Sequence, residues 1–99
     1  MRDLLDDAQL ENAKKLLPDW EVSAEFLFRV FLFKNFVEAF DFMTAISSTA
    51  EEMNHHPDWA NVYNKVEVRL STHDSGGVTS LDVELALSLI HISEPTRPY

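Results

Sequence analysis

The stretch FLFRVFLFKNFVEAFDFM, residues 26–43, changes its apolar period midway and so decides the fold class. Its first part, residues 26–33, is apolar apart from Arg29 and predicts a strand. From Phe36 onward apolar residues recur at spacings of three and four, which is the period of a helix with one buried face. A strand followed almost at once by a long helix is therefore expected at the centre of the chain.

The strand at residues 26–33 has two unusually apolar faces. Alternate side chains fall on opposite faces, which are Phe26, Phe28, Val30 and Leu32 on one side and Leu27, Arg29, Phe31 and Phe33 on the other. An antiparallel sheet commonly keeps one face in water. We therefore expect helices to cover one face, and either a partner subunit to cover the other or aromatic surface to remain exposed.

Shorter elements precede this strand. Residues 4–17 place leucines among charges and predict a short amphipathic helix that Pro18 stops. Trp20, Val22 and Ala24 then alternate as in a strand. The link to the next strand is very short, which predicts a hairpin.

The long helix carries signals at both ends. Asn35 can cap its start. Pro57 disfavours helical geometry at His56, so the helix should end near Asn54. His55 and His56 therefore fall at the helix C-terminus or in the loop just after it.

Downstream, VYNKVEVRL at residues 62–70 is the clearest strand, and we interpret it as one straight strand. STHDSGG at residues 71–77 predicts a turn in which the two glycines supply unusual backbone dihedrals. Residues 78–79 predict a brief last strand, and residues 80–92 predict a final helix.

The expected order is helix, strand, strand, helix, strand, strand, helix. This order predicts an α+β fold, in which an antiparallel four-stranded sheet is packed on one face by about three helices. Residues 1–92 are expected to form a single domain. Residues 93–99, SEPTRPY, differ from the rest, and their two prolines predict a disordered tail or one added for expression.

Composition restricts the classes of function. The formal net charge is -9, and an acidic surface repels phosphate backbones and anionic membranes, so neither direct nucleic-acid binding nor membrane binding is expected. The chain has no cysteine, which excludes disulfides and thiolate metal sites. The first residues are too charged for a signal peptide, so we expect a cytoplasmic protein, or also a nuclear one in a eukaryote.

The polar side chains that could carry chemistry are concentrated in the second half of the chain. They are Glu51, Glu52, His55, His56, Asp58, His73, Asp74 and Asp82. Histidine has an unperturbed pKa of about 6.5, which lets it give and take a proton near neutrality. Adjacent rings do not titrate independently, so the pair could hold one acid and one base at once.

Other interpretations of these residues stay open. A histidine near a helix C-terminus can simply cap carbonyls and gain from the helix dipole. His55, His56 and His73 with an acid could instead hold zinc or iron, although adjacent residues usually point in different directions. Asp82 can be a favourable acid at a helix start, and Trp59 can be a core residue.

The spacing of these residues resembles a known family, the pterin-4a-carbinolamine dehydratases. The shared features are Glu51-x-x-x-His55-His56-Pro57, Trp59, the string NVYNKV, and LSTHD with Asp82 nine residues beyond His73. The likeness runs from about residue 20 to residue 89 and includes AFDFM in the long helix. Some members of the family are also known as dimerisation cofactors of a homeodomain transcription factor.

The resemblance implies an activity. Family members are lyases that eliminate water from 4a-hydroxytetrahydrobiopterin or a related 4a-hydroxytetrahydropterin. The product is the quinonoid dihydropterin, and the reaction recycles the cofactor of aromatic amino-acid hydroxylases. The resemblance implies no metal and no organic cofactor. It also implies a homodimer or homotetramer, and a protein partner of transcription-factor type by family analogy alone.

The resemblance also assigns roles to residues. Dehydration of a carbinolamine needs one proton delivered to the leaving hydroxyl and another removed from a ring nitrogen. By analogy His55 and His73 do this acid/base work and His56 positions the pterin, so these three form the expected catalytic set. The supporting set comprises Glu51 to bind or orient, Pro57 and Trp59 to wall the pocket, and Asp82 to orient His73. Which histidine is the acid does not follow from the sequence.

One distance constrains how the histidines can meet. A straight strand over residues 63–71 would separate its ends by about 26 Å, at about 3.3 Å per residue. His56 and His73 flank that strand. Either PDWAN, residues 57–61, doubles back along it, or another subunit completes the site; we expect the doubling back.

Two further functions stay open. One is a non-catalytic interaction module that uses the same fold. The other is a pterin enzyme of molybdopterin metabolism. Around HISEPTRPY, residues 91–99, the chain departs from the family, and the last helix is expected to be cut or replaced there.

Overall fold

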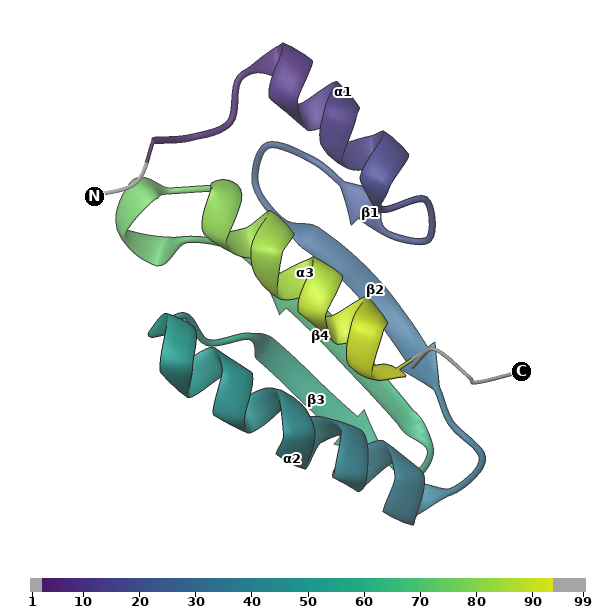
Figure 1. Cartoon of the computed structure of the whole chain (residues 1–99). Helices are drawn as coiled ribbons and strands as arrows, with labels where there is room; N and C mark the ends of the chain where they lie inside the picture. Colours follow the sequence, from purple (N-terminus) through teal and green to yellow (C-terminus); the bar gives the residue numbers. More distant parts are fainter. Residues whose placement is uncertain (1–2, 94–99) are drawn as a thin grey trace.

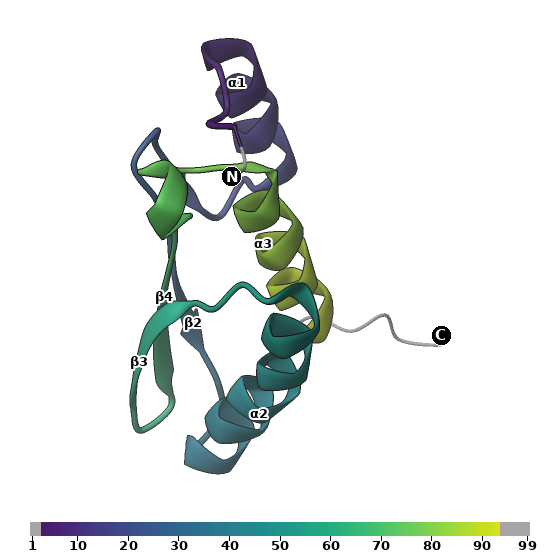
Figure 2. The ribbon, with the colours of Figure 1, turned by 90° about the vertical axis from the view of Figure 1, so that its left-hand side faces the viewer.

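The structure, a computed structural model, describes residues 3–93 and has two layers (Figure 1). Its elements are α1 (Asp7–Leu16), β1 (Glu21–Val22), β2 (Leu27–Leu32), α2 (Phe36–Met53), β3 (Asp58–Val62), β4 (Lys65–Leu70), the 3-10 turn η1 (His73–Ser75) and α3 (Ser80–Ser93). The strands form one antiparallel sheet in the order β1-β2-β4-β3, and the helices lie on one side of it (Figure 2). The predicted α+β class and element order are confirmed. The predicted tail, apart from Ser93 at the end of α3, lies outside the described residues.

The long helix α2 begins and ends where its capping residues predict. Asn35 Oδ1 accepts the N–H of Glu38 at 2.9 Å. At the other end Asn54 takes a left-handed conformation with φ 52°, and its N–H donates to the last carbonyls of the helix. Asparagine adopts this conformation more readily than most residues. The chain therefore leaves the helix axis just before His55.

The prediction of one straight strand over residues 62–70 is wrong, because the chain reverses at Tyr63 and Asn64. β3 and β4 instead pair antiparallel across this turn. Tyr63 has φ 52°, which is uncommon for an aromatic residue. The Asn61 side-chain amide donates to the carbonyls of Tyr63, at 3.0 Å, and Lys65, at 2.9 Å. These two hydrogen bonds stabilise the reversal.

The doubling back of residues 57–61 is confirmed, because most of this segment is β3, which runs back along β4. Asp58 pairs with Arg69, near the end of β4. The reversal thus returns His56 to the end of the sheet from which His73 follows, and no second subunit is needed to bring the two segments together.

The predicted strand at residues 78–79 is also wrong. Val78 links two loops instead, because its N–H donates to the Ala24 carbonyl and its own carbonyl accepts from the Leu5 N–H, each at 3.0 Å. Its side chain is buried. The fourth strand of the sheet is β3, formed mostly by the residues that were expected to double back along β4.

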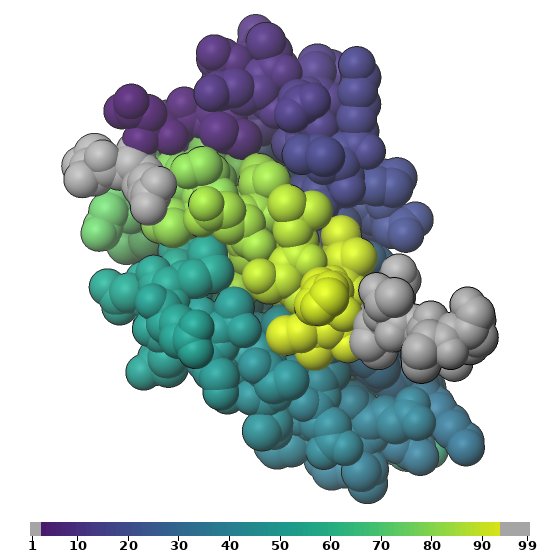
Figure 3. Space-filling model, viewed as in Figure 1, coloured from purple at the N-terminus to yellow at the C-terminus, as the bar shows by residue number. Residues whose placement is uncertain are grey.

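The hydrophobic core lies between the sheet and the helices. Its buried members in these elements include Leu27 and Phe31 of β2, Val66, Val68 and Leu70 of β4, Phe42 and Ile46 of α2, and Leu85 and Leu89 of α3. Seen from the helical side, the three helices form adjacent bands across the molecule (Figure 3). Within residues 3–93 no helix is long and apolar enough to cross a membrane.

The opposite face of the sheet keeps apolar side chains in contact with solvent. Leu32 is 72% exposed, and Val30 is also exposed. The Arg69 guanidinium lies over the rings of Phe26 and Phe28, 4.6 Å and 5.8 Å from their centroids. Of the two expectations for this strand, exposed apolar surface is what a single chain shows; a covering partner subunit stays a prediction.

Candidate active site

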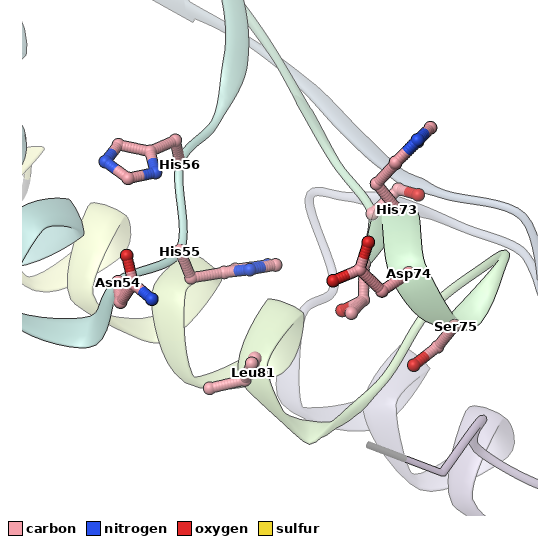
Figure 4. Close-up of a pocket in the computed structure, with 9 residues that line it drawn as sticks. Asn54, His55, His56, His73, Asp74, Ser75 and Leu81 are labelled. Carbon is pink, nitrogen blue, oxygen red and sulfur yellow. The ribbon is translucent and has the colours of Figure 1, made fainter. Parts of the chain in front are cut away.

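A cavity of about 490 Å³ opens between the C-terminal end of α2, the turn after β4 and the start of α3 (Figure 4). It is lined by Asn54, His55, His56, Ser71, Thr72, His73, Asp74, Ser75 and Leu81. The three histidines of the expected catalytic set therefore border one hollow. Its volume lies in the range of sites for small organic ligands.

His55 and His56 point to different sides because the helix ends just before them. The His55 N–H still donates to the Ala50 carbonyl at 3.0 Å. In Figure 4 the His55 ring extends toward the turn after β4, whereas the His56 ring turns to the other side. His55 is buried and His56 is exposed. Side chains of adjacent residues in extended backbone point in opposite directions, so the His55 ring is enclosed and the His56 ring is exposed to solvent.

Asp82 pairs with His55, and the expectation that it orients His73 is wrong. His55 Nε2 lies 2.6 Å from Asp82 Oδ1. Asp82 lies in the first turn of α3 and has no solvent exposure. α3 packs against α2, whereas the segment that carries His73 contacts this carboxylate through the side chain of Thr72. The carboxylate contacts a different histidine from the one expected, and its orienting role stays a prediction.

The same carboxylate also caps α3. Asp82 Oδ2 accepts the backbone N–H of Thr79 at 2.9 Å, and Thr79 Oγ1 accepts the N–H of Leu81 at 3.3 Å. The arrangement is close to a capping box, except that Thr79 accepts from the second residue of the helix rather than the third. The sequence offered two alternatives for Asp82, a favourable acid at a helix start or a partner of a histidine. In the structure the same carboxylate makes both contacts.

His56 makes an exposed pair with Glu51. Its Nε2 lies 2.5 Å from Glu51 Oε2, and both side chains are mostly in solvent. Glu51 sits in the last turn of α2 and does not line the cavity. It reaches the site through His56, which does.

His73 begins η1 and is exposed. In Figure 4 its ring points away from His55, whereas the Asp74 carboxylate on the same turn points toward the His55 ring. The structure therefore brings the segment of His73 to the cavity, but it leaves the two rings apart. Asp74 was among the concentrated polar residues but was given no role from the sequence.

Two glycines shape this turn for different reasons. Gly76 has φ 78°, in the left-handed region, as the sequence predicts. Gly77 is needed for space instead, because a Cβ there would lie 2.5 Å from the Ala24 carbonyl oxygen.

Pro57 and Trp59 are not among the residues that line the cavity. Trp59 of β3 lies opposite Val68 of β4 and is packed against the core. Neither Pro57 nor Trp59 borders the cavity in this structure, and a role for them in walling the pterin pocket stays a prediction. Among residues 3–93 no three His, Cys, Asp or Glu side chains are placed to hold one metal ion.

Sequence reasoning missed the buried hydroxyls of Thr72 and Thr79. Thr72 Oγ1 lies 2.8 Å from Asp82 Oδ2 and 2.7 Å from Thr79 Oγ1. Threonine has no titratable group and attracts no attention in a sequence. A buried carboxylate needs donors, however, and a search for them around Asp82 would have found both.

Known proteins resemble this chain over most of its length. A family model described as pterin 4 alpha carbinolamine dehydratase matches residues 3–91. A Synechococcus sp. (strain WH7803) protein is 49% identical over 89 residues, covering 90% of this chain and 96% of its own length. A Bradyrhizobium diazoefficiens protein is 55% identical over 82 residues, covering 81% and 82%. Both carry the provisional name pterin-4-alpha-carbinolamine dehydratase.

A solved structure supports the same relationship. It is a transcriptional coactivator/pterin dehydratase from Brucella melitensis, with a TM-score of 0.88 at 38% identity. The alignment covers 92% of this chain and 99% of that chain. The likeness in sequence and in fold therefore extends over the elements that build the cavity.

Proposed function

This chain belongs to the pterin 4 alpha carbinolamine dehydratase family, and on that premise we propose that it eliminates water from a 4a-hydroxytetrahydropterin. The product is the quinonoid dihydropterin, which a reductase of the hydroxylase cycle would consume. The observation that carries the proposal is the buried His55–Asp82 pair, which borders a cavity shared with His56 and His73.

The reaction needs one proton acceptor and one proton donor. The carbon–oxygen bond at C4a breaks, the adjacent ring nitrogen loses its proton, and a carbon–nitrogen double bond forms. The departing hydroxyl takes up a proton and leaves as water, so there is no net oxidation. Positioned side chains that transfer these protons typically contribute about 100-fold or more to the rate.

His55 is suited to accept the proton. A carboxylate can only accept hydrogen bonds, so the contact with Asp82 places hydrogen on Nε2 and leaves Nδ1 as an acceptor. His55 lines the cavity, so in this proposal a bound pterin meets its Nδ1.

We assign proton delivery to His73 and substrate holding to His56. His73 is exposed, so rotation of its side chain can bring the ring over the cavity without disturbing packed neighbours. His56 borders the cavity and its Nε2 faces Glu51, so by the same reasoning its Nδ1 is left to accept a hydrogen bond from the pterin. The loop hydroxyls of Ser71 and Ser75 offer further polar contacts for a flat, polar bicyclic ring.

The proposal is tested by following the ultraviolet absorbance of the 4a-hydroxy adduct as it decays. The wild-type protein should accelerate the decay well beyond buffer, and His55→Ala and His73→Ala should each lower kcat by about 100-fold. His91→Ala, outside the cavity, is the control and should match the wild type. No acceleration by the wild type would refute the proposal. Activity that a chelator abolishes would favour the metal alternative.

Assembly and partner binding remain proposals alongside the enzyme activity. The Brucella relative is described as a coactivator as well as a dehydratase. In this chain α2 exposes Phe36, Val37 and Phe40 to solvent. We propose that such surface is covered in a homodimer or homotetramer, which the molar mass in solution would reveal.

A further inference from the structure

The hydroxyl of Thr72 lies at the centre of a buried hydrogen-bond network behind His55. Thr72 is buried, and its Oγ1 is 2.8 Å from Asp82 Oδ2 and 2.7 Å from Thr79 Oγ1. Thr79 has no solvent exposure, and neither has Asp82. Because water does not reach Asp82 or Thr79, their polar side-chain atoms must find hydrogen-bond partners within the protein.

The protons in this network can be assigned one by one. A hydroxyl carries one hydrogen, and the Asp82 carboxylate accepts only, so the Thr72 hydrogen points to Asp82. Because the only hydroxyl hydrogen of Thr72 is already directed to Asp82, the Thr79 hydroxyl must donate to the Thr72 oxygen. Thr79 Oγ1 in turn accepts the N–H of Leu81. The chain of donors therefore runs from the start of α3 through both threonines to the carboxylate.

This direction determines how Asp82 meets His55. Oδ2 is occupied by the Thr72 hydroxyl and the Thr79 N–H, so Oδ1 is left for His55 Nε2. If the carboxylate rotated, it would break the contacts on Oδ2 in a place where no water could replace them. The Thr72 hydroxyl thus restrains the carboxylate, and through it the tautomer and direction of the His55 ring.

Thr72 differs from Thr79 in the segment it belongs to. Thr79 precedes α3, and the helix cap explains its contacts with Asp82 and Leu81. Thr72 follows β4 and immediately precedes His73. Its carbonyl accepts the N–H groups of Ser75 and Gly76, each at 3.0 Å, which closes the turn that begins with His73. Thr72 therefore joins the turn that begins with His73 to Asp82, whose carboxylate contacts His55.

We propose that Thr72 is a positioning residue for the dehydration, which holds Asp82 in the orientation that presents Nδ1 of His55 to the cavity. The role rests on the proposed function for its kinetic consequence, but the tautomer of His55 can be measured without any substrate. Thr72 touches no reacting atom in this assignment. It acts through Asp82 and, by its backbone, through the turn of His73.

The test replaces Thr72 with valine, which has the same shape and no hydroxyl, and with serine, which keeps the hydroxyl. Thr72→Val should lower kcat by about tenfold with KM changed by less than about twofold, and Thr72→Ser should recover most of the rate. Thr44→Val on α2 is the matched control, because Thr44 is exposed and its hydroxyl bonds only its own helix. Thr72→Ala removes the hydroxyl without a methyl against the carboxylate, and it replaces the valine variant if valine does not fold.

A spectroscopic measurement separates positioning from packing. Nitrogen-15 chemical shifts of the histidine side chains in the substrate-free protein should show hydrogen on Nε2 of His55 in the wild type and in Thr72→Ser. A mixture of tautomers is expected in Thr72→Val. Wild-type kcat together with a wild-type tautomer in Thr72→Val would overturn the proposal, as would a serine variant as slow as the valine variant. If the wild type itself does not dehydrate the pterin, the proposed function fails, while the nitrogen shifts still decide whether Thr72 orients His55.

Discussion

Two histidine–carboxylate pairs adjoin the end of α2, and they differ in burial rather than in contact distance. Nε2 of His55 lies 2.6 Å from Asp82, and Nε2 of His56 lies 2.5 Å from Glu51. The side chains of the inner pair are 9% and 0% exposed, whereas those of the outer pair are 57% and 76% exposed. Similar contacts therefore act in very different surroundings.

This difference in burial indicates which pair can fix the orientation of its histidine ring. Water competes for every hydrogen bond of the outer pair, and salt screens its attraction, so the partners can separate at little cost. The inner carboxylate meets His55, Thr72 and Thr79, and no solvent can replace a lost donor. In the proposed reaction the inner pair fixes the His55 ring, and the outer pair is an adjustable contact at the rim of the cavity.

The largest effect is expected from Asp82→Asn, which keeps the shape of the inner pair and removes its charge. An amide can turn its NH₂ group toward His55 and force Nε2 to accept, which inverts the tautomer. We expect kcat to fall by about 100-fold or more. We also expect the free energy of unfolding to fall by about 2 kcal/mol, because buried donors lose a charged acceptor.

Stopped-flow decay of the adduct and urea unfolding measure these two quantities. Glu84→Gln, an exposed acid on the same helix, is the control and should change neither. Full activity in Asp82→Asn would show that the inner pair does not set the geometry of the reaction.

A smaller effect is expected from the glycines of the turn, where an enclosed position again adjoins an open one. A Cβ at Gly77 would lie 2.5 Å from the Ala24 carbonyl oxygen, which is a backbone atom and cannot move aside freely. Gly77→Ala should therefore lower the free energy of unfolding by about 2 kcal/mol. Gly76→Ala meets no atom within 4 Å and should cost about 1 kcal/mol, from its φ of 78° alone.

Urea unfolding of the two glycine variants side by side provides the measurement. Because the shift at Gly77 moves the turn of His73, Gly77→Ala should also slow dehydration more than Gly76→Ala does. Equal losses of stability in both variants would mean that the turn adapts more freely than the contact with Ala24 indicates.

The smallest effect is expected from Glu51→Gln in the outer pair. Exposed ion pairs contribute little, so the free energy of unfolding should change by less than about 0.5 kcal/mol. Loss of the carboxylate frees the His56 ring, and a rise in KM of about threefold with kcat nearly unchanged is expected. Initial rates over a range of pterin concentrations separate the two constants. A loss of kcat comparable to that of Asp82→Asn would abolish the distinction between the pairs.

Local signals in the sequence predicted the elements that rely on local contacts. The Asn35 cap and the end of α2 near Asn54 follow from hydrogen bonds between residues a few positions apart. The histidine pair could therefore be placed at a helix end without a structure. The alternation of Val66, Val68 and Leu70 likewise identified the buried face of β4.

The hairpin of β3 and β4 was missed because its turn preserves the strand pattern. Val62 and Val66 keep the period of two on either side of Tyr63 and Asn64, and there is no glycine or proline between them to mark a reversal. The left-handed Tyr63 is stabilised by the Asn61 side chain, whose acceptors become neighbours only once the chain has turned. Periodicity records which residues face inward but not where the strand changes direction.

By itself the sequence determined the α+β class, the helix boundaries, the family and the set of histidines, because propensity, capping and residue spacing are properties of the chain as written. Only the tertiary structure decided which carboxylate serves which histidine. Asp82 is nine residues from His73 and 27 residues from His55, yet it bonds the more distant one. The packing of α3 against α2 brings that pair together and leaves His73 in solvent. Burial then turns one of two similar contacts into the fixed part of the site, because only there is water excluded from competing for it.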